Sequence, residues 1–220
     1  MILGYNTNGF AHHRLDDALH VIAELGYRAV ALTPDANHLH PDHTSDAQLR
    51  ATRALLEKLD LAVVIETGAR YVLDPRRKQR PTLIDADAEG RARRLDFLER
   101  CARIAAALGD WERLRDAVSL PDFGLTLDVG HVPCTEPISA GDAIRKYGDA
   151  LRTVHLDDST NGVHEHLQIG DGSLDWPDIM RALRDVGFAG IASVELSRHS
   201  HAAPEAARIA LERLNAALSK

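Results

Sequence analysis

Short apolar runs alternate with longer amphipathic segments along the chain. The apolar runs are rich in Val, Ile, Leu and Thr and nearly continuous, as expected for strands that are buried on both faces of a parallel sheet. Six such strands are predicted, at residues 2–7, 28–34, 62–67, 123–128, 153–157 and 192–196. Between them, apolar residues recur at spacings of three and four, which is typical of helices that pack one face against a sheet. The pattern predicts an α/β fold of repeated strand-helix units.

The alternation fails at one place, after the helix predicted at 85–108. A second helix, predicted at 110–118, follows it with no strand between them. Other helices are predicted at 137–147, 175–186 and 204–218. An eight-stranded barrel of this kind takes ~250 residues, whereas this chain has 220. We therefore expect a single domain over 1–220, a (β/α) TIM-type barrel of parallel strands that lacks about two strand-helix units after residue 109.

Six strands cannot close an eight-stranded cylinder, so the sheet should have an open edge with unpaired backbone groups. Two arrangements would cover such an edge. In one, the chain is a homo-oligomer and another copy covers it. In the other, the natural protein has a segment that this sequence lacks, and the abrupt join at Gly109 and Asp110 favours this second arrangement.

Charge and composition exclude several classes of partner. The chain has 33 acidic and 26 basic residues, a formal charge of −7 that argues against a broad nucleic-acid platform. No apolar stretch approaches the ~20 residues of a membrane span, so we expect no membrane partner and a cytoplasmic location. Cys101 and Cys134 are too few for a disulfide framework and are expected to be reduced thiols.

Histidines and acids gather where predicted strands end. Eleven of the 12 histidines follow or end a strand, namely His12, His13, His38, His40, His43, His131, His155, His164, His166, His199 and His201. Acids at strand ends are Glu66, Asp128, Asp157, Asp158 and Glu195. Parallel strands present their carboxyl ends on one face, so these groups should meet there. Imidazole with carboxylate suits a divalent cation, and Mn, Co, Zn and Mg all stay open. Any single histidine is more often a solvated loop residue or a helix cap than a ligand, but His155 lies in a buried run, which favours ligation.

Two basic segments lie near the same face. The loop after the third strand contains Arg70, Arg76, Arg77, Lys78 and Arg80. It can hold a phosphate or carboxylate of a substrate or simply be solvated, and Arg70, nearest the strand end, is the candidate for binding. Arg198, in the tail of the last strand, can close over a polyol or cap the final helix.

Four motifs carry a resemblance to a known family. They lie at 125–131 (LTLDVGH), 154–158 (VHLDD), 164–176 (HEHLQIGDGSLDW) and 193–197 (SVELS). In this order they resemble the xylose-isomerase-like TIM-barrel superfamily, and the resemblance covers nearly the whole chain. That group includes sugar isomerases and epimerases, inosose dehydratases, hydroxypyruvate isomerases and metal-dependent apurinic endonucleases.

The resemblance implies a metal site and catalytic roles. In the isomerase members a Glu, an Asp, a His and a second Glu hold a divalent metal, and Asp128, His155 and Glu195 match the last three. The first Glu would lie on the strand that is missing. Glu195 is by resemblance also a possible base. His131 resembles a histidine that contacts a substrate oxygen or a second metal.

Further roles follow for the loop after the fifth strand. His166 matches the His of an Asp-x-His metal pair in the endonuclease members, whereas His164 departs from that pattern. We therefore predict His166 as a further metal ligand and His131, Glu66 and Glu195 as catalytic residues. Predicted substrate-binding residues are Arg70, His164, Asp157 and Arg198.

The resemblance leaves three functions open. The first is a metal-dependent isomerase or epimerase of a small sugar or sugar derivative, which removes a proton next to a carbonyl. The second is a degenerate barrel that binds a metal or ligand without turnover, because the first Glu is absent. The third is an endonuclease-like phosphodiesterase, which the negative charge and the missing strands oppose.

Overall fold

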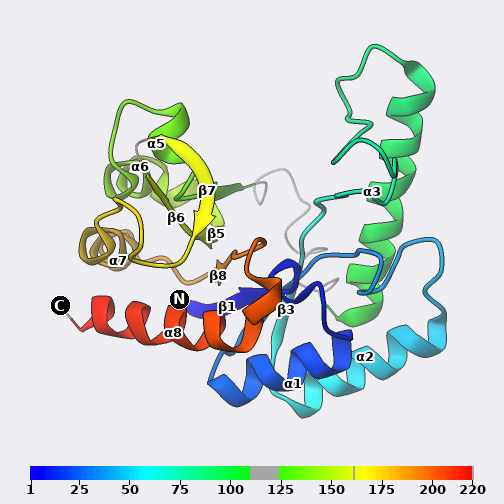
Figure 1. Ribbon diagram of the computed structural model, residues 1–220, viewed down its shortest axis with the longest axis horizontal. Helices are drawn as coiled ribbons and strands as arrows, with labels where there is room; N and C mark the ends of the chain where they lie inside the picture. The colour runs from blue at the N-terminus through cyan, green and yellow to red at the C-terminus, as the bar shows by residue number, and fades with distance from the viewer. Residues whose placement is uncertain (110–123, 161, 220) are drawn as a thin grey trace.

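The computed structural model describes residues 1–109, 124–160 and 162–219, and within them a curved parallel sheet forms the centre of the molecule (Figure 1). Its six strands are β1 (Ile2–Asn6), β2 (Ala29–Leu32), β3 (Ala62–Ile65), β4 (Leu125–Asp128), β5 (Leu151–Leu156) and β8 (Ile191–Val194). They lie in the order β3-β2-β1-β8-β5-β4. The sheet is a curled part of a TIM-type barrel, and β3 and β4 are its two edges.

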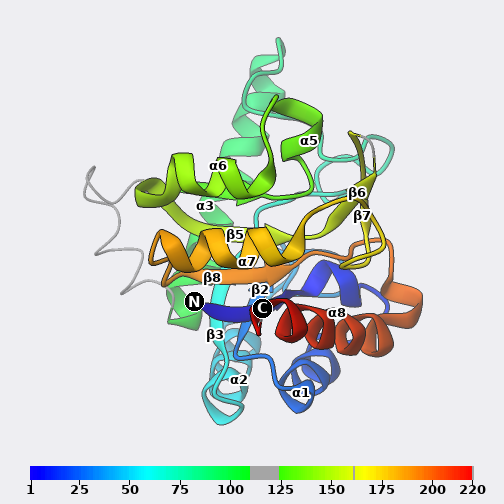
Figure 2. The ribbon, with the colours of Figure 1, turned by 90° about the vertical axis from the view of Figure 1, so that its left-hand side faces the viewer.

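The helices repeat the order of the strands on the outer side of the sheet (Figure 2). The long ones are α1 (Leu15–Leu25), α2 (Asp46–Lys58), α3 (Ala88–Leu108), α6 (Ala140–Tyr147), α7 (Trp176–Asp185) and α8 (Ala203–Leu218). Contacts run from α3 to α2, α1, α8, α7 and α6 in turn. Each helix therefore packs beside the one that covers the neighbouring strand, as in a barrel with consecutive units.

Local signals explain where the helices begin and end. Ser45 and Gln48 form a capping box, in which each side chain bonds to the backbone of the other residue at the start of α2. Gly26 ends α1 with a φ of 105°, a left-handed conformation that glycine adopts without strain. One contiguous apolar core joins these helices to the strands, with Tyr5, Tyr27 and Ile144 fully buried within it.

The strand register brings three predicted site residues together. β4 and β5 pair so that Asp128 lies opposite His155. β5 and β8 pair so that His155 lies opposite Ser193, and the backbone N–H of Glu195 donates to the carbonyl of Leu156 just beyond β8. All three side chains thus belong to the carboxyl ends of adjacent strands.

The fold class predicted from the sequence is confirmed, including the six parallel strands of an incomplete barrel. The helix predicted at 110–118 lies outside the described residues, and the single domain over 1–220 stays a prediction.

The segment with His164 and His166, expected to be a loop, is instead an antiparallel hairpin of β6 (Asp158–Thr160) and β7 (Val163–Leu167). Short elements also went unpredicted: 3-10 turns at η1 (Thr7–Phe10), η3 (Gly148–Ala150) and η4 (Ser200–Ala202), and the one-turn helix α5 (Val132–Thr135). Among the described residues, no helix is long and apolar enough to cross a membrane.

Candidate active site

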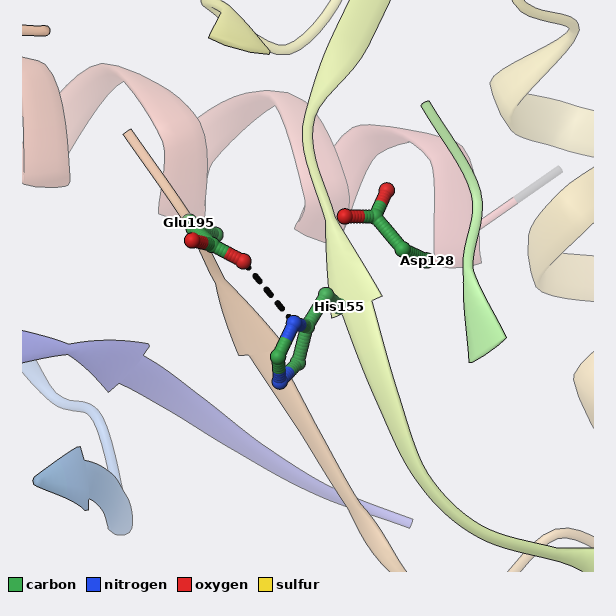
Figure 3. Close-up of side chains that lie close together, drawn as sticks. All are labelled: Asp128, His155 and Glu195. Atoms are coloured by element: carbon green, nitrogen blue, oxygen red, sulfur yellow. Dashed lines mark ion pairs between the residues drawn. The ribbon is translucent and has the colours of Figure 1, made fainter. Parts of the chain in front are cut away.

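His155 lies between two carboxylates at the centre of the site. Its Nδ1 is 2.8 Å from Oε2 of Glu195, and its Nε2 is 3.2 Å from Oε2 of Glu66 (Figure 3 shows the first pair). The His155 side chain is only 11% exposed. Burial by itself lowers the pKa of His155, but the hydrogen bonds to Glu195 and Glu66 outweigh it and raise that pKa well above its usual value.

The Glu195 carboxylate is held on both of its oxygens. Oε2 contacts His155, and Oε1 accepts a hydrogen bond of 2.8 Å from Nδ2 of Asn8. Asn8 is itself fixed, because its backbone N–H donates to the side chain of the buried Asn6 at 3.0 Å. Burial raises the pKa of Glu195, but the contact with His155 prevails and lowers it to about 2. Glu195 is therefore an ionised acceptor in a fixed orientation.

Asp128 completes a compact trio with His155 and Glu195. One ligand atom from each of these three side chains lies within 4.8 Å of the other two (Figure 3). Oδ1 of Asp128 accepts the backbone N–H of Gly130 at 3.0 Å and that of His131 at 3.2 Å, which orients the carboxylate. Burial first, and then the nearby Asp157 and Glu195, raise the pKa of Asp128 to about 8.

Two further histidines border the trio. Nε2 of His131 is 3.4 Å from Oδ2 of Asp128, and partial burial lowers the pKa of His131. Nδ1 of His166 is 2.6 Å from Oδ2 of the fully buried Asp157. His166 adopts a φ of 49°, a left-handed conformation that is uncommon outside glycine, and it lines the cavity beside the trio.

Asp158 has a structural role that its place in the sequence motif did not reveal. It is fully buried, and its two oxygens accept hydrogen bonds from the backbone N–H groups of Ser159, Gly170 and Leu174 and from Nε1 of Trp176. The carboxylate thereby anchors the turn between β7 and α7. This turn follows β7, the strand that carries His166.

A cavity of about 500 Å³ lies over these groups. Eight predicted site residues line it: Glu66, Arg70, Asp128, His131, His155, His166, Glu195 and Arg198. Asp157, predicted to bind substrate, is fully buried against His166 and is not among the residues that line the cavity. His164 lies on β7, and its side chain is outside the described part of the structure. The other described histidines do not line this cavity; His40 and His43, for example, stack on each other at 4.5 Å between ring centroids.

Several lining residues were not predicted from the sequence. They are Asn8, Thr33, Gly68, Tyr71 and Gln79. Asn8 had a signal, because it follows the first strand in the same way as the acids follow theirs. Thr33 and Gln79 had none, since an uncharged side chain near a strand end is common and gains meaning only from its neighbours.

The donor set fits a divalent cation. One imidazole and two carboxylates in a compact trio are good ligands for Mn, Co or Zn. Burial and the nearby Asp157 and Glu195 raise the pKa of Asp128, and the hydrogen bonds to Glu195 and Glu66 raise the pKa of His155, so both groups would release a proton when a cation binds. His166 stays outside the trio, so its role as a ligand stays a prediction.

Comparison with known proteins agrees with this architecture. The family model described as "Xylose isomerase-like TIM barrel" matches residues 19–112 and 109–217. The chain is 39% identical over 80 residues, 36% of its length, to D-psicose 3-epimerase of Enterocloster bolteae, and 28% identical over 75 residues, 34% of its length, to an uncharacterized protein of Methanocaldococcus jannaschii. These alignments span only 25% and 26% of the two relatives, about a quarter of each.

Solved structures share the fold across the full chain. A D-psicose 3-epimerase crystallised in the presence of D-fructose has a TM-score of 0.69 at 18% identity, with 100% of both chains covered. A xylose isomerase domain protein from Alicyclobacillus acidocaldarius has a TM-score of 0.67 at 17% identity, again over 100% of both chains. At such identities the likeness concerns the fold alone. The two segments that the family model matches together cover most of this chain. The chain therefore belongs to the xylose isomerase-like TIM barrel family.

Proposed function

We propose that the protein is a divalent-metal-dependent isomerase or epimerase of a small sugar or sugar derivative. The observation that carries this proposal is the trio of Asp128, His155 and Glu195, which opens into a polar cavity at the carboxyl ends of the strands. Similarity to proteins named D-psicose 3-epimerase supports a sugar substrate. It also makes D-fructose and D-psicose the first ketoses to test.

Proton transfer next to a carbonyl is the chemistry that this site can perform. A divalent cation held by the trio would polarise the carbonyl oxygen and acidify the neighbouring C–H group. The chain must then supply a carboxylate to take the proton and a group to return it. Return to the adjacent carbon gives isomerisation, and return to the other face of the same carbon gives epimerisation.

We assign proton transfer to Glu195 and Glu66. They contact different nitrogens of the His155 ring, so their carboxylates approach the cavity from two sides. Glu66 is outside the metal trio and 28% exposed, which leaves it accessible to a substrate. Glu66 thus provides a second carboxylate, although the part of the chain that the structure describes has no strand between β3 and β4 to bear the first metal-binding Glu.

The remaining predicted residues take supporting roles in this proposal. His131 is half exposed and has a lowered pKa, so near neutral pH its neutral imidazole can donate a hydrogen bond to a substrate oxygen. Arg70 and Arg198 contact the substrate from the cavity wall. Asp157 acts as a positioning residue, because it is buried and holds the ring of His166. His166 then contacts either the substrate or a further metal.

Metal content tests the trio directly. Elemental analysis of the purified protein should find near-stoichiometric Mn, Co or Zn, and a His155→Gln, Glu195→Gln double variant should lose it. His12→Gln is the control, because His12 is exposed and does not line the cavity. Wild-type protein that takes up no metal when one is offered would refute the proposed site, as would a double variant that keeps its metal.

Proton exchange separates catalysis from metal binding. Incubation of D-fructose or D-psicose in D₂O should place deuterium beside the carbonyl, which NMR detects whatever the product. We expect Asp128→Ala to lose exchange together with metal. Glu66→Gln should keep the metal and slow exchange by about 10²-fold or more, the usual contribution of a general base. Bound metal without exchange on any sugar tested would instead support the non-catalytic ligand-binding alternative.

A further inference from the structure

Three cationic side chains line the same cavity as the metal trio. Arg70 and Lys78 come from the segment between β3 and α3, and Arg198 comes from the segment after β8. In the sheet, β2 and β1 separate β3 from β8. Two segments from separate parts of the sheet therefore bring positive charge to one cavity.

The metal-loaded cavity carries a net positive charge. With a divalent cation bound, Asp128 would be ionised and His155 neutral, so the three lining carboxylates of Glu66, Asp128 and Glu195 would offset the three cationic side chains. A divalent cation in the trio adds two positive charges. The loaded cavity is then positive inside a chain whose formal charge is −7. A positive cavity walled by protein concentrates the field and attracts an anionic ligand.

The cationic segment is held in place by its backbone and by an ion pair. Arg70 and Gln79 adopt φ values of 39° and 60°, and the backbone N–H of Gln79 donates to the carbonyl of Arg70. This bond closes the loop that carries Lys78. Nη1 of Arg70 is 3.2 Å from Oδ2 of Asp35, an ion pair that places the guanidinium beside this carboxylate. A guanidinium has five N–H donors, so this contact leaves others for a ligand.

We propose that Arg70, Lys78 and Arg198 form a subsite for an oxyanion, a phosphate ester or a carboxylate, carried by the sugar at the end remote from its carbonyl. The proposal rests on the proposed function for the position of the carbonyl at the metal trio. A guanidinium pairs with two oxyanion oxygens at once, which Arg70 and Arg198 can both do, and Lys78 adds a point charge. The volume of about 500 Å³ lies within the range of pockets that enclose small ligands.

Calorimetric titration of the metal-loaded protein tests the subsite. The probes are D-fructose 6-phosphate, D-fructuronate and D-fructose, which share a carbonyl region and differ in the terminal group. The variants are Lys78→Met and Arg198→Met, both at exposed positions. Arg76→Met is the matched control, because Arg76 lies on the same loop but does not line the cavity.

We expect at least one of the two anionic sugars to bind about tenfold or more tightly than D-fructose, and each variant to weaken that binding about tenfold. The control should bind as the wild type does, and added salt should weaken the anionic sugar selectively. The anion that gains more identifies phosphate or carboxylate as the recognised group. Equal affinity for all three sugars, or variants that bind as the wild type does, would overturn the subsite.

The outcome is independent of turnover. Selective binding of an anionic sugar without proton exchange on any of the three probes would support the subsite and refute the proposed reaction. Exchange on D-fructose without tighter binding of either anionic sugar would support the reaction and refute the subsite.

Discussion

Replacement of Asp158 by Ala should destabilise the protein more than any other single acid-to-alanine change near the site. The Asp158 carboxylate is fully buried and accepts four hydrogen bonds. The donors are the backbone N–H groups of Ser159 at 2.9 Å, Gly170 at 2.8 Å and Leu174 at 3.2 Å, and Nε1 of Trp176 at 2.8 Å. Alanine would leave all four donors without this acceptor.

The magnitude follows from the number of donors. The bonds from Ser159 and Trp176 are buried, and those from Gly170 and Leu174 are partly buried. A buried donor that loses its partner costs about 1–3 kcal/mol, so the two buried bonds give a loss of about 4 kcal/mol in the free energy of unfolding. That is a large part of the ~5–15 kcal/mol that stabilises a typical domain. For a chain of this length each kcal/mol lowers Tm by about 2–4 °C, so we expect a fall of roughly 8–16 °C.

Thermal and urea unfolding followed by circular dichroism measures this loss. Asp171→Ala is the matched control on the same turn, since Asp171 is 53% exposed and pairs with Arg213 at 2.6 Å on the surface. An exposed ion pair contributes less than about 1 kcal/mol. If Asp158→Ala unfolded within 1 kcal/mol of the control variant, the anchoring role of Asp158 would be wrong.

Two other predictions concern the packing and the protonation of the trio. In Gly130→Ala the new Cβ would lie 2.3 Å from Oδ1 of the buried Asp157, so the free energy of unfolding measured in urea should fall by about 1–3 kcal/mol. In Gly68→Ala the new Cβ would meet only Oε1 of Glu66, at 3.8 Å, so this variant should be as stable as the wild type. Equal stability of both variants would contradict this packing. The pKa of Asp128 is raised to about 8, and the pKa of His155 is also raised. Below these pKa values, bound protons compete with the metal for the two side chains. Metal affinity should therefore rise with pH up to about 8. Competition titrations from pH 6 to pH 9 should show it, and a flat profile would contradict it.

The sequence alone determined the class of fold and the composition of the site. Apolar runs of five to seven residues separated by amphipathic segments predict strands and helices because each pattern matches the burial that its element needs. Parallel strands carry their carboxyl ends to one face, so the positions of Asp128, His155 and Glu195 at strand ends are enough to predict that they meet. The break in the alternation after Gly109 was likewise visible in the sequence, because a second helix is predicted there where a strand is expected.

Only the tertiary structure decided how the side chains meet. The contacts of His155 with Glu66, of Glu195 with Asn8 and of Arg70 with Asp35 join residues 35 to 187 positions apart, and no local pattern encodes them. The hairpin of β6 and β7 escaped prediction because its strands are short and polar. The hairpin is held by the pairing of β6 with β7 and by the turn that Asp158 anchors, rather than by burial of an apolar face. Periodicity reports which face of an element is buried, whereas the partner of a polar group is fixed only when the strands take their register.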